Sequence, residues 1–218
     1  MGHRNPRRFT GFLKKMKINK QQKLLYIHIP KCGGQAIRDA LCMTTWVDNH
    51  ANVRKVRDQV PSMWNDYLKF TSIRNPWEAE VSNFFYKLGP VVQTARDGIE
   101  HIEATLIGFK NHVKQYGIST YPFVEDSKFP RSMMRFITDE NGDIIVDEVL
   151  RLESVNEDLQ RMCEKHNLKK PNEVKIRNAT NHLHYSHYYT DQEMIDYVYE
   201  KNQDYIEKFD YDFEQQFY

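Results

Sequence analysis

Acidic residues are absent from the first 38 positions of the chain, which carry ten Lys and Arg. The first acid is Asp39, and the 180 residues after position 38 have a net charge of −9, so the whole chain of 218 residues balances at +1. A balance so close to zero argues against a general nucleic-acid binder. We expect residues 1–22 to form a basic, loosely held arm and residues 23–218 to fold as a single domain.

Long apolar runs and paired cysteines are also missing. No stretch of about 18 apolar residues exists, so the sequence predicts no transmembrane helix. The N-terminus lacks the continuous apolar segment of a secretory signal. Cys32, Cys42 and Cys163 are widely spaced and form no CxxC pair, which argues against a disulfide framework and a zinc site. These absences lead us to expect a soluble, cytoplasmic protein.

Strands and helices are predicted to alternate through the first third of the chain. The order is a strand (24–30), a glycine turn (31–34), a helix (35–43), a second strand (68–73) and a second helix (76–87). Both strands are short apolar runs, as in buried parallel strands. Asn75 is a good N-cap and Pro76 a good first residue for the last of these helices. This order predicts an α/β fold with a central parallel β-sheet and flanking helices.

The rest of the chain adds further elements. Apolar spacing predicts helices over residues 51–60 and 95–116. Capping boxes at residues 154–157 and 190–193 predict two more helix starts. A hairpin is expected over residues 136–146, around Asn141-Gly142, and a short strand over 149–152.

One lysine and two glycines stand between the first strand and its helix, namely Lys31, Gly33 and Gly34. Glycines let the backbone approach a ligand closely, the helix start offers N–H donors, and the lysine adds a full charge. A bare Gly-Gly pair would indicate only a tight turn, but a lysine directly after a buried strand favours an anion site. The turn is P-loop-like without being a Walker A motif. Its lysine precedes the glycines, and no Ser or Thr follows to hold magnesium.

Two of these segments resemble the phosphate-binding motifs of the sulfotransferase superfamily. Residues 26–34 (YIHIPKCGG) resemble its 5′-phosphosulfate loop. Residues 70–77 (FTSIRNPW) resemble its 3′-phosphate segment, which pairs an arginine with a serine eight residues later, here Arg74 and Ser82. Later stretches are similar to the carbohydrate-type branch, at residues 151–153 (RLE), 178–180 (NAT), 188–190 (YYT) and 210–213 (DYDF). The resemblance runs from about residue 24 to residue 213 in the family's order.

The resemblance implies a donor and a role for each matching residue. The family takes a sulfuryl group from 3′-phosphoadenosine 5′-phosphosulfate (PAPS), releases 3′-phosphoadenosine 5′-phosphate (PAP) and needs no metal. Lys31 would stabilise the leaving group, with the turn of Cys32, Gly33, Gly34, Gln35 and Ala36 around the 5′-phosphate. Arg74 and Ser82 would hold the 3′-phosphate, and Arg177 falls where the family closes a loop over the nucleotide.

The acceptor's proton calls for a base near the donor sulfur. In carbohydrate-type sulfotransferases a base His or Glu comes from the stretch that here contains His50, and Asp48 could orient that imidazole or act as the base itself. We expect a structural role for His28, whose backbone belongs to the first strand. We interpret the histidine cluster as acceptor-side or surface residues rather than metal ligands; it consists of His182, His184 and His187.

Three alternatives stay open. A P-loop kinase or other nucleotide-binding protein would bind ATP with magnesium, although the Walker Ser or Thr is missing. A non-catalytic PAP- or PAPS-binding homologue is suggested because Gln35 and Ala36 replace the family's hydroxyl side chains. An adaptor that binds membranes or nucleic acid through residues 1–22 would show steep salt dependence.

We favour sulfuryl transfer to a hydroxyl, on a carbohydrate, by a bacterial or viral enzyme with no nucleic-acid partner. The segments 87–95 and 114–130, where acceptor specificity would arise, carry no motif. The sequence does not indicate an oligomeric state.

Overall fold

The computed structural model describes residues 17–43, 50–88, 99–118, 132–175 and 182–214. The chain divides into two compact units. The sheet unit comprises Met1–Ile73 and Phe136–Arg177, and the helical unit comprises Arg74–Arg135 and Asn178–Tyr218. That residues 23–218 form a single domain stays a prediction, and no linker-like composition marks the division into units.

A four-stranded sheet forms the centre of the sheet unit, in the order β1 (Lys17–Asn19), β2 (Leu24–Ile27), β3 (Leu68–Ile73) and β4 (Glu148–Arg151). Strands β2, β3 and β4 run parallel, which confirms the predicted α/β fold with a central parallel sheet. Strand β1 pairs antiparallel with β2. It lies within residues 1–22, where we expected a loosely held arm, so the last part of that segment belongs to the sheet.

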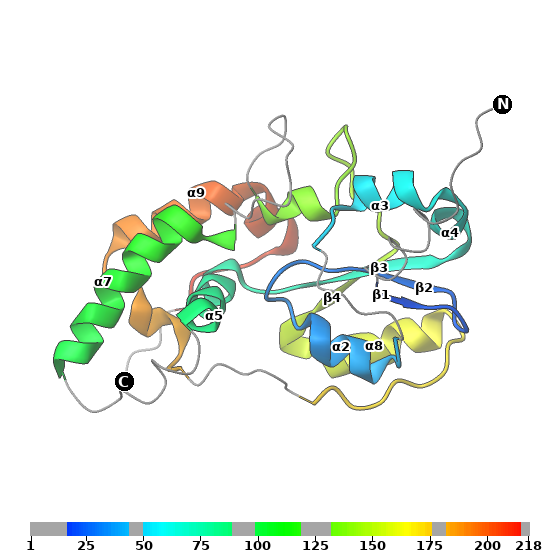
Figure 1. Ribbon diagram of the computed structural model, residues 1–218, viewed down its shortest axis with the longest axis horizontal. Helices are drawn as coiled ribbons and strands as arrows, with labels where there is room; N and C mark the ends of the chain where they lie inside the picture. The colour runs from blue at the N-terminus through cyan, green and yellow to red at the C-terminus, as the bar shows by residue number, and fades with distance from the viewer. Residues whose placement is uncertain (1–16, 44–49, 89–98, 119–131, 176–181, 215–218) are drawn as a thin grey trace. The chain divides into compact units, whose positions relative to one another are not determined.

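Helices cover both faces of this sheet (Figure 1). They are α2 (Gly34–Ala40) and α8 (Val155–Lys165) on one face and α3 (Val53–Gln59) and α4 (Pro61–Asp66) on the other. Ile37 of α2, Phe70 of β3 and Leu159 of α8 are fully buried in the core between sheet and helices. Strand β2 is buried at every position, as expected for a central strand in a parallel sheet.

The helical unit is built around α5 (Pro76–Leu88), which packs against α7 (Ile99–Tyr116), η4 (Tyr185–Tyr188) and α9 (Gln192–Phe209). Aromatic rings fill the contacts, with Phe84 edge-on to Phe109 at 5.4 Å. Helix α9 is kinked at Asn202, whose φ of −128° lies outside the helical region. Its side chain accepts from the N–H of Met133 at 3.1 Å, which anchors the kink. Two short 3₁₀ helices complete the described elements, η2 (Met133–Phe136) and η3 (Leu152–Ser154).

Several predicted boundaries shift in the structure. The helix predicted over residues 51–60 continues as two helices, because Pro61 begins α4 directly after Val60. Helix α9 is capped by Asp191, whose side chain accepts from the N–H of Met194, one residue after the predicted Thr190. The hairpin expected over residues 136–146 is reduced to a single antiparallel bridge between Thr138 and Ile144. In the described segments, no helix is both long and apolar enough to cross a membrane.

Candidate functional site

The loop that follows β2 contains two left-handed residues in three positions. Lys31 has a φ of +64° and Gly33 a φ of +74°. A Cβ at Gly33 would lie 2.4 Å from Cδ1 of Leu152, so both the backbone angle and the close approach require glycine. Lys31 adopts this conformation with a full side chain, which is uncommon and indicates that the surrounding structure fixes the loop.

A chain of buried hydroxyls holds this loop from the neighbouring strand. The Ser72 hydroxyl of β3 donates to the carbonyl of Cys32 at 2.5 Å. Because that hydroxyl has one proton, Tyr26 of β2 must donate its own to Ser72 Oγ, at 2.5 Å. Burial is the main cause that raises the pKa of the Tyr26 phenol far above its usual value, which keeps it protonated as a donor. The loop backbone is therefore fixed by groups from two parallel strands.

The six residues from Lys31 to Ala36 lie in one continuous turn and helix start, as the sequence predicted. Helix α2 begins at Gly34, and the N–H of Ile37 donates to the Gly33 carbonyl at 3.1 Å. Cys32 is fully buried, with Sγ 3.5 Å from the carbonyl of Pro30, in keeping with a packing role. Lys31 and Gln35 are partly exposed.

His50 and His28 lie against each other next to this loop. Their ring centroids are 4.4 Å apart, and Nδ1 of His50 lies 3.2 Å from the backbone carbonyl of His28. A carbonyl can only accept, so neutral His50 carries its proton on Nδ1 and its lone pair on Nε2. Nε2 is therefore the nitrogen able to take a proton. Asp48, the alternative base, lies outside the described residues.

Arg74, at the start of the helical unit, has a tightly held backbone. The hydroxyl of Tyr205 accepts from the Arg74 N–H at 3.0 Å and donates to the Arg74 carbonyl at 3.1 Å. Asn75 caps α5 by accepting from the N–H of Trp77, as the sequence predicted. Tyr205 stands 131 positions later in the chain, and no local signal in the sequence identifies it as a partner.

The Arg74 guanidinium pairs with Glu78 at 2.8 Å, one helical turn away. Burial acts to raise the pKa of Glu78, but Arg74, with smaller contributions from His182 and His184, lowers it overall. Glu78 is therefore a carboxylate beside Arg74. Ser82 lies two turns into α5 and is 5% exposed. This ion pair is the ordinary structural role of such an arginine, and a phosphate at Arg74 would have to be bound next to it.

A buried polar cluster connects α5 with the end of α7. Glu80 is 3% exposed and accepts from the N–H of Ile118 at 2.7 Å. Asn83 Nδ2 lies 3.2 Å from His112 Nε2. Burial raises the pKa of Glu80 to about 7, although the Ile118 N–H and Lys87 act in the opposite direction. Burial also lowers the pKa of His112 to about 4, and the positive charge of Lys87 lowers it further. Sequence reasoning missed this cluster, because its members lie on different segments.

The remaining predicted residues separate into three groups. Trp77 and Phe84 of α5 are 2% and 3% exposed and thus belong to the core. His182 stacks on Phe85 with ring centroids 5.4 Å apart, and the described residues include no group of three or more His, Cys, Asp or Glu arranged to hold a metal ion. Arg177 falls outside the described residues, as do most of the predicted acceptor segments.

Comparison with known proteins gives one match. The family model described as "Sulfotransferase family" matches residues 14–212, and thus includes both the loop after β2 and the start of α5. Searches of the curated proteins and of the solved structures returned no match.

Proposed function

The chain belongs to the sulfotransferase family, and from this premise we propose that it transfers a sulfuryl group from PAPS to a hydroxyl of a carbohydrate acceptor. The observation that carries this proposal is the loop after β2. A glycine that tolerates no Cβ, a lysine in the left-handed region and a carbonyl held by Ser72 together fix the backbone of a turn that carries a cationic side chain. Such rigidity suits a group that stabilises charge in a transition state.

Lys31 and the turn through Ala36 act on the 5′-phosphate. As the bond between sulfur and the bridging oxygen breaks, the electron pair stays on that oxygen and negative charge grows there. The Lys31 ammonium stabilises this charge, and the backbone N–H groups of Gln35 and Ala36 add donors. By analogy with phosphoryl transfer, positioning and electrostatics supply most of the catalysis.

Arg74 and Ser82 act on the 3′-phosphate. A guanidinium can bind two phosphate oxygens at once, and a hydroxyl can donate to a third. The backbone clamp by Tyr205 supports this role, because it fixes the point from which the Arg74 side chain extends. The neighbouring Glu78 carboxylate keeps the guanidinium oriented when no phosphate is bound.

His50 serves as the base. The acceptor hydroxyl gives its proton to Nε2 of His50 as its oxygen attacks sulfur, and PAP leaves with the electron pair of the broken bond. The contact of Nδ1 with the His28 carbonyl supports this role, because it sets the tautomer that leaves Nε2 basic. His28 thus positions the base through its backbone.

Turnover tests the proposal. PAPS is incubated with a panel of mono- and oligosaccharides, and PAP release and sulfated product are measured. We expect transfer that persists with a chelator present and a kcat that falls by about 10²-fold or more in His50→Asn, with PAP affinity retained. The matched control is His166→Asn, since His166 is a partly exposed histidine of the same unit, paired with Glu148.

The alternatives give different results in the same assay. PAP binding without sulfated product from any acceptor indicates a non-catalytic homologue, which the loss of hydroxyls at Gln35 and Ala36 would explain. Magnesium-dependent ATP binding without PAP binding indicates a nucleotide-binding protein of the P-loop kinase type. Either result contradicts sulfuryl transfer.

A further inference from the structure

A groove runs along α2 on the side of the segment 168–175. It consists of two hollows of about 350 and 410 Å³, which adjoin at Ala40 and Asn172. The N–H of Asn172 donates to the Ala40 carbonyl at 2.9 Å, which fixes the segment beside the helix. The groove thus begins at Ala36, two residues after the Gly-Gly turn, and ends at Cys42.

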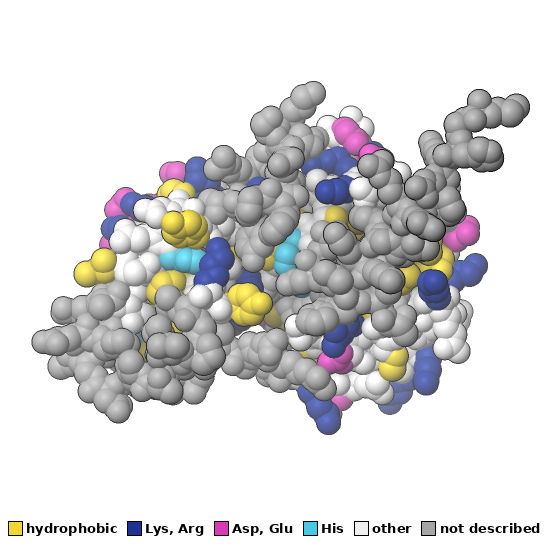
Figure 2. Space-filling model, in the orientation of Figure 1, with side chains coloured by type: hydrophobic (Ala, Val, Ile, Leu, Met, Phe, Trp, Pro, Cys, Tyr) yellow, Lys and Arg dark blue, Asp and Glu magenta, His cyan; other side chains and the backbone are white. Residues whose placement is uncertain are grey.

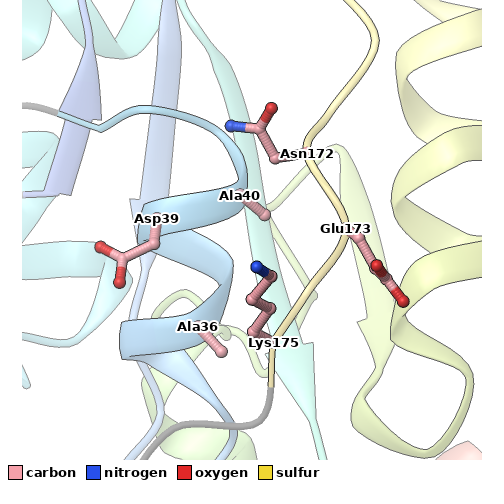
Figure 3. A pocket seen from close by; sticks show the side chains of 6 residues that line it. All are labelled: Ala36, Asp39, Ala40, Asn172, Glu173 and Lys175. Carbon is pink, nitrogen blue, oxygen red and sulfur yellow. The ribbon is translucent and has the colours of Figure 1, made fainter.

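Small side chains on α2 leave the space open, and a lysine enters it. Figure 3 shows Ala36 and Ala40 facing the extended segment, with the Lys175 side chain lying between the helix and that segment. At the other end the hollow is lined by Lys20, Lys169 and Lys170. Basic side chains are exposed on this part of the sheet unit, at the lower right of Figure 2.

These four lysines differ from the lysines that form ion pairs. Lys69, Lys110, Lys114 and Lys165 each pair with a carboxylate within 3.0 Å. Within the described segments, no hydrogen bond or ion pair involves the amino group of Lys20, Lys169, Lys170 or Lys175.

Two acids line the first hollow. Asp39 is bound by Arg38 at 2.6 Å, and Glu173 points away from α2 (Figure 3). The groove therefore has a surplus of positive charge.

The other lining groups restrict the chemistry of the ligand. Carboxamides also line the second hollow, at Gln21, Gln22 and Asn172. A fourth, Asn19, is buried and already bonds the Leu41 carbonyl and the Gln22 N–H. Among the described residues, the lining contains no aromatic side chain and no arginine, the groups on which nucleic-acid bases stack. These lining residues also form no large apolar wall for a lipid chain. Amides and amino groups suit hydroxyls together with sulfate or phosphate esters.

We propose that this groove binds a polyanionic saccharide or polyol, with its sulfate or phosphate esters on the four lysines and its hydroxyls on the carboxamides. Because α2 has seven residues, the groove extends about 10 Å from the phosphate loop. Ala36 belongs both to this groove and to the turn proposed to hold the 5′-phosphate, and the rest of the groove extends away from that turn. The role of this ligand in catalysis rests on the proposed function, because in a sulfotransferase it would be an acceptor or a product chain.

Cys42 provides a direct readout of occupancy. It lines the groove and is exposed, whereas Cys32 and Cys163 are buried. We expect sucrose octasulfate to slow the reaction of Cys42 with a thiol reagent in the full chain by about tenfold at saturation, and neutral sucrose to leave the rate unchanged. Inositol hexakisphosphate in place of sucrose octasulfate shows whether sulfate or phosphate esters are preferred, and protection by either one supports the groove.

Charge removal assigns the binding to the groove. Lys169→Gln/Lys170→Gln should weaken sucrose octasulfate binding by about tenfold, the loss expected for two partly screened charge-assisted hydrogen bonds. Lys55→Gln/Lys208→Gln removes two exposed lysines elsewhere and should leave binding unchanged. PAP affinity, measured in parallel by calorimetry, should be the same in all three proteins, so failure of the donor site is distinguished from failure of the groove.

Four results overturn the inference. The first is no protection of Cys42 by either polyanion. The second is equal weakening by the two double variants, which would indicate diffuse charge attraction. The third is complete competition by PAP with a loss of PAP affinity in Lys169→Gln/Lys170→Gln, which would assign the groove to the donor nucleotide. Equal protection by a thymidine oligonucleotide would likewise contradict a saccharide or polyol ligand.

Discussion

The chain leaves β2 and β3 by two different turns, and in each a buried hydroxyl holds the backbone beside a cationic residue. After β2 the backbone enters the left-handed region at Lys31 and Gly33, and Ser72 clamps the intervening carbonyl. After β3 the chain continues directly into a capped helix, and Tyr205 clamps both backbone groups of Arg74. The first clamp comes from the adjacent strand, and the second comes from the far end of the sequence.

This difference shows two ways to fix a cationic residue. The turn after β2 depends on one glycine and on strain at a lysine, so its shape is set by local backbone angles. The turn after β3 has ordinary helix-start geometry and depends on a distant side chain. Different substitutions should therefore disrupt the two turns: changes at Gly33 or Ser72 affect the turn after β2, and changes at Tyr205 affect the turn after β3.

Gly33→Ala should have the largest effect. The Cβ would meet Leu152 at 2.4 Å while the backbone keeps a φ of +74°, and the two penalties together amount to about 3–4 kcal/mol of unfolding free energy. Urea denaturation measures it. The control is Gly142→Ala, because Gly142 has a φ of +89° but no atom within 4 Å of a Cβ, so only the conformational cost of about 1 kcal/mol remains. Equal costs for the two variants would contradict the close packing of the loop.

Glu80→Gln should change how the stability of α5 and its neighbours depends on pH. With a pKa of about 7 in the folded chain against an ordinary 4.5, Glu80 keeps a proton that the unfolded chain releases between these values. The unfolding free energy therefore falls by about 3 kcal/mol as the pH rises through this window and is constant above it. His112, with its pKa lowered to about 4, gives the opposite slope between pH 4 and its usual value near 6.5.

The two contributions can be separated by unfolding measurements across pH 4–8. Glu80→Gln should leave only the rise due to His112, and His112→Gln should leave only the fall due to Glu80. A fall in stability between pH 4.5 and 7 that persists in Glu80→Gln would show that another group causes it.

Tyr205→Phe and Ser72→Ala compare the two clamps directly. Tyr205→Phe leaves the N–H and the carbonyl of Arg74 without their partner. Ser72→Ala leaves the Cys32 carbonyl without its donor and the Tyr26 hydroxyl without its acceptor. Because each substitution removes two buried hydrogen bonds, each should cost about 2 kcal/mol. In PAP titrations each variant should weaken binding by less than removal of the nearby cationic side chain. If Ser72→Ala leaves PAP affinity unchanged, the hydroxyl chain does not position the loop for the nucleotide.

Local patterns were sufficient to predict the strands β2 and β3, the capped start of α5 and the turn from Lys31 to Ala36. Each depends on neighbouring residues, such as the apolar run before Pro30 or Asn75 followed by Pro76. The sequence did not reveal Tyr205 or Ser72 as clamps. Those contacts join residues 131 and 40 positions apart and depend on the folded backbone.

Local sequence patterns also did not predict the short strand β1 or the exact start of α9. Strand β1 has three residues and is defined by its pairing with β2 rather than by its own pattern. Asp191 rather than Thr190 caps α9, a shift of one residue that residue preferences do not resolve. The paired rings of His28 and His50 follow from tertiary contact alone, although His50 was predicted from its place between the two phosphate motifs.

Calorimetric titration with PAP tests most directly whether these two turns bind one donor nucleotide. The wild-type chain should bind PAP at one site, and Lys31→Ala and Arg74→Ala should each weaken binding at least about tenfold, or about 1.4 kcal/mol. Arg161→Ala, which removes an exposed arginine of α8 paired with Asp158, should leave the affinity unchanged. Absence of PAP binding, or an affinity indifferent to both Lys31→Ala and Arg74→Ala, would contradict the assignment.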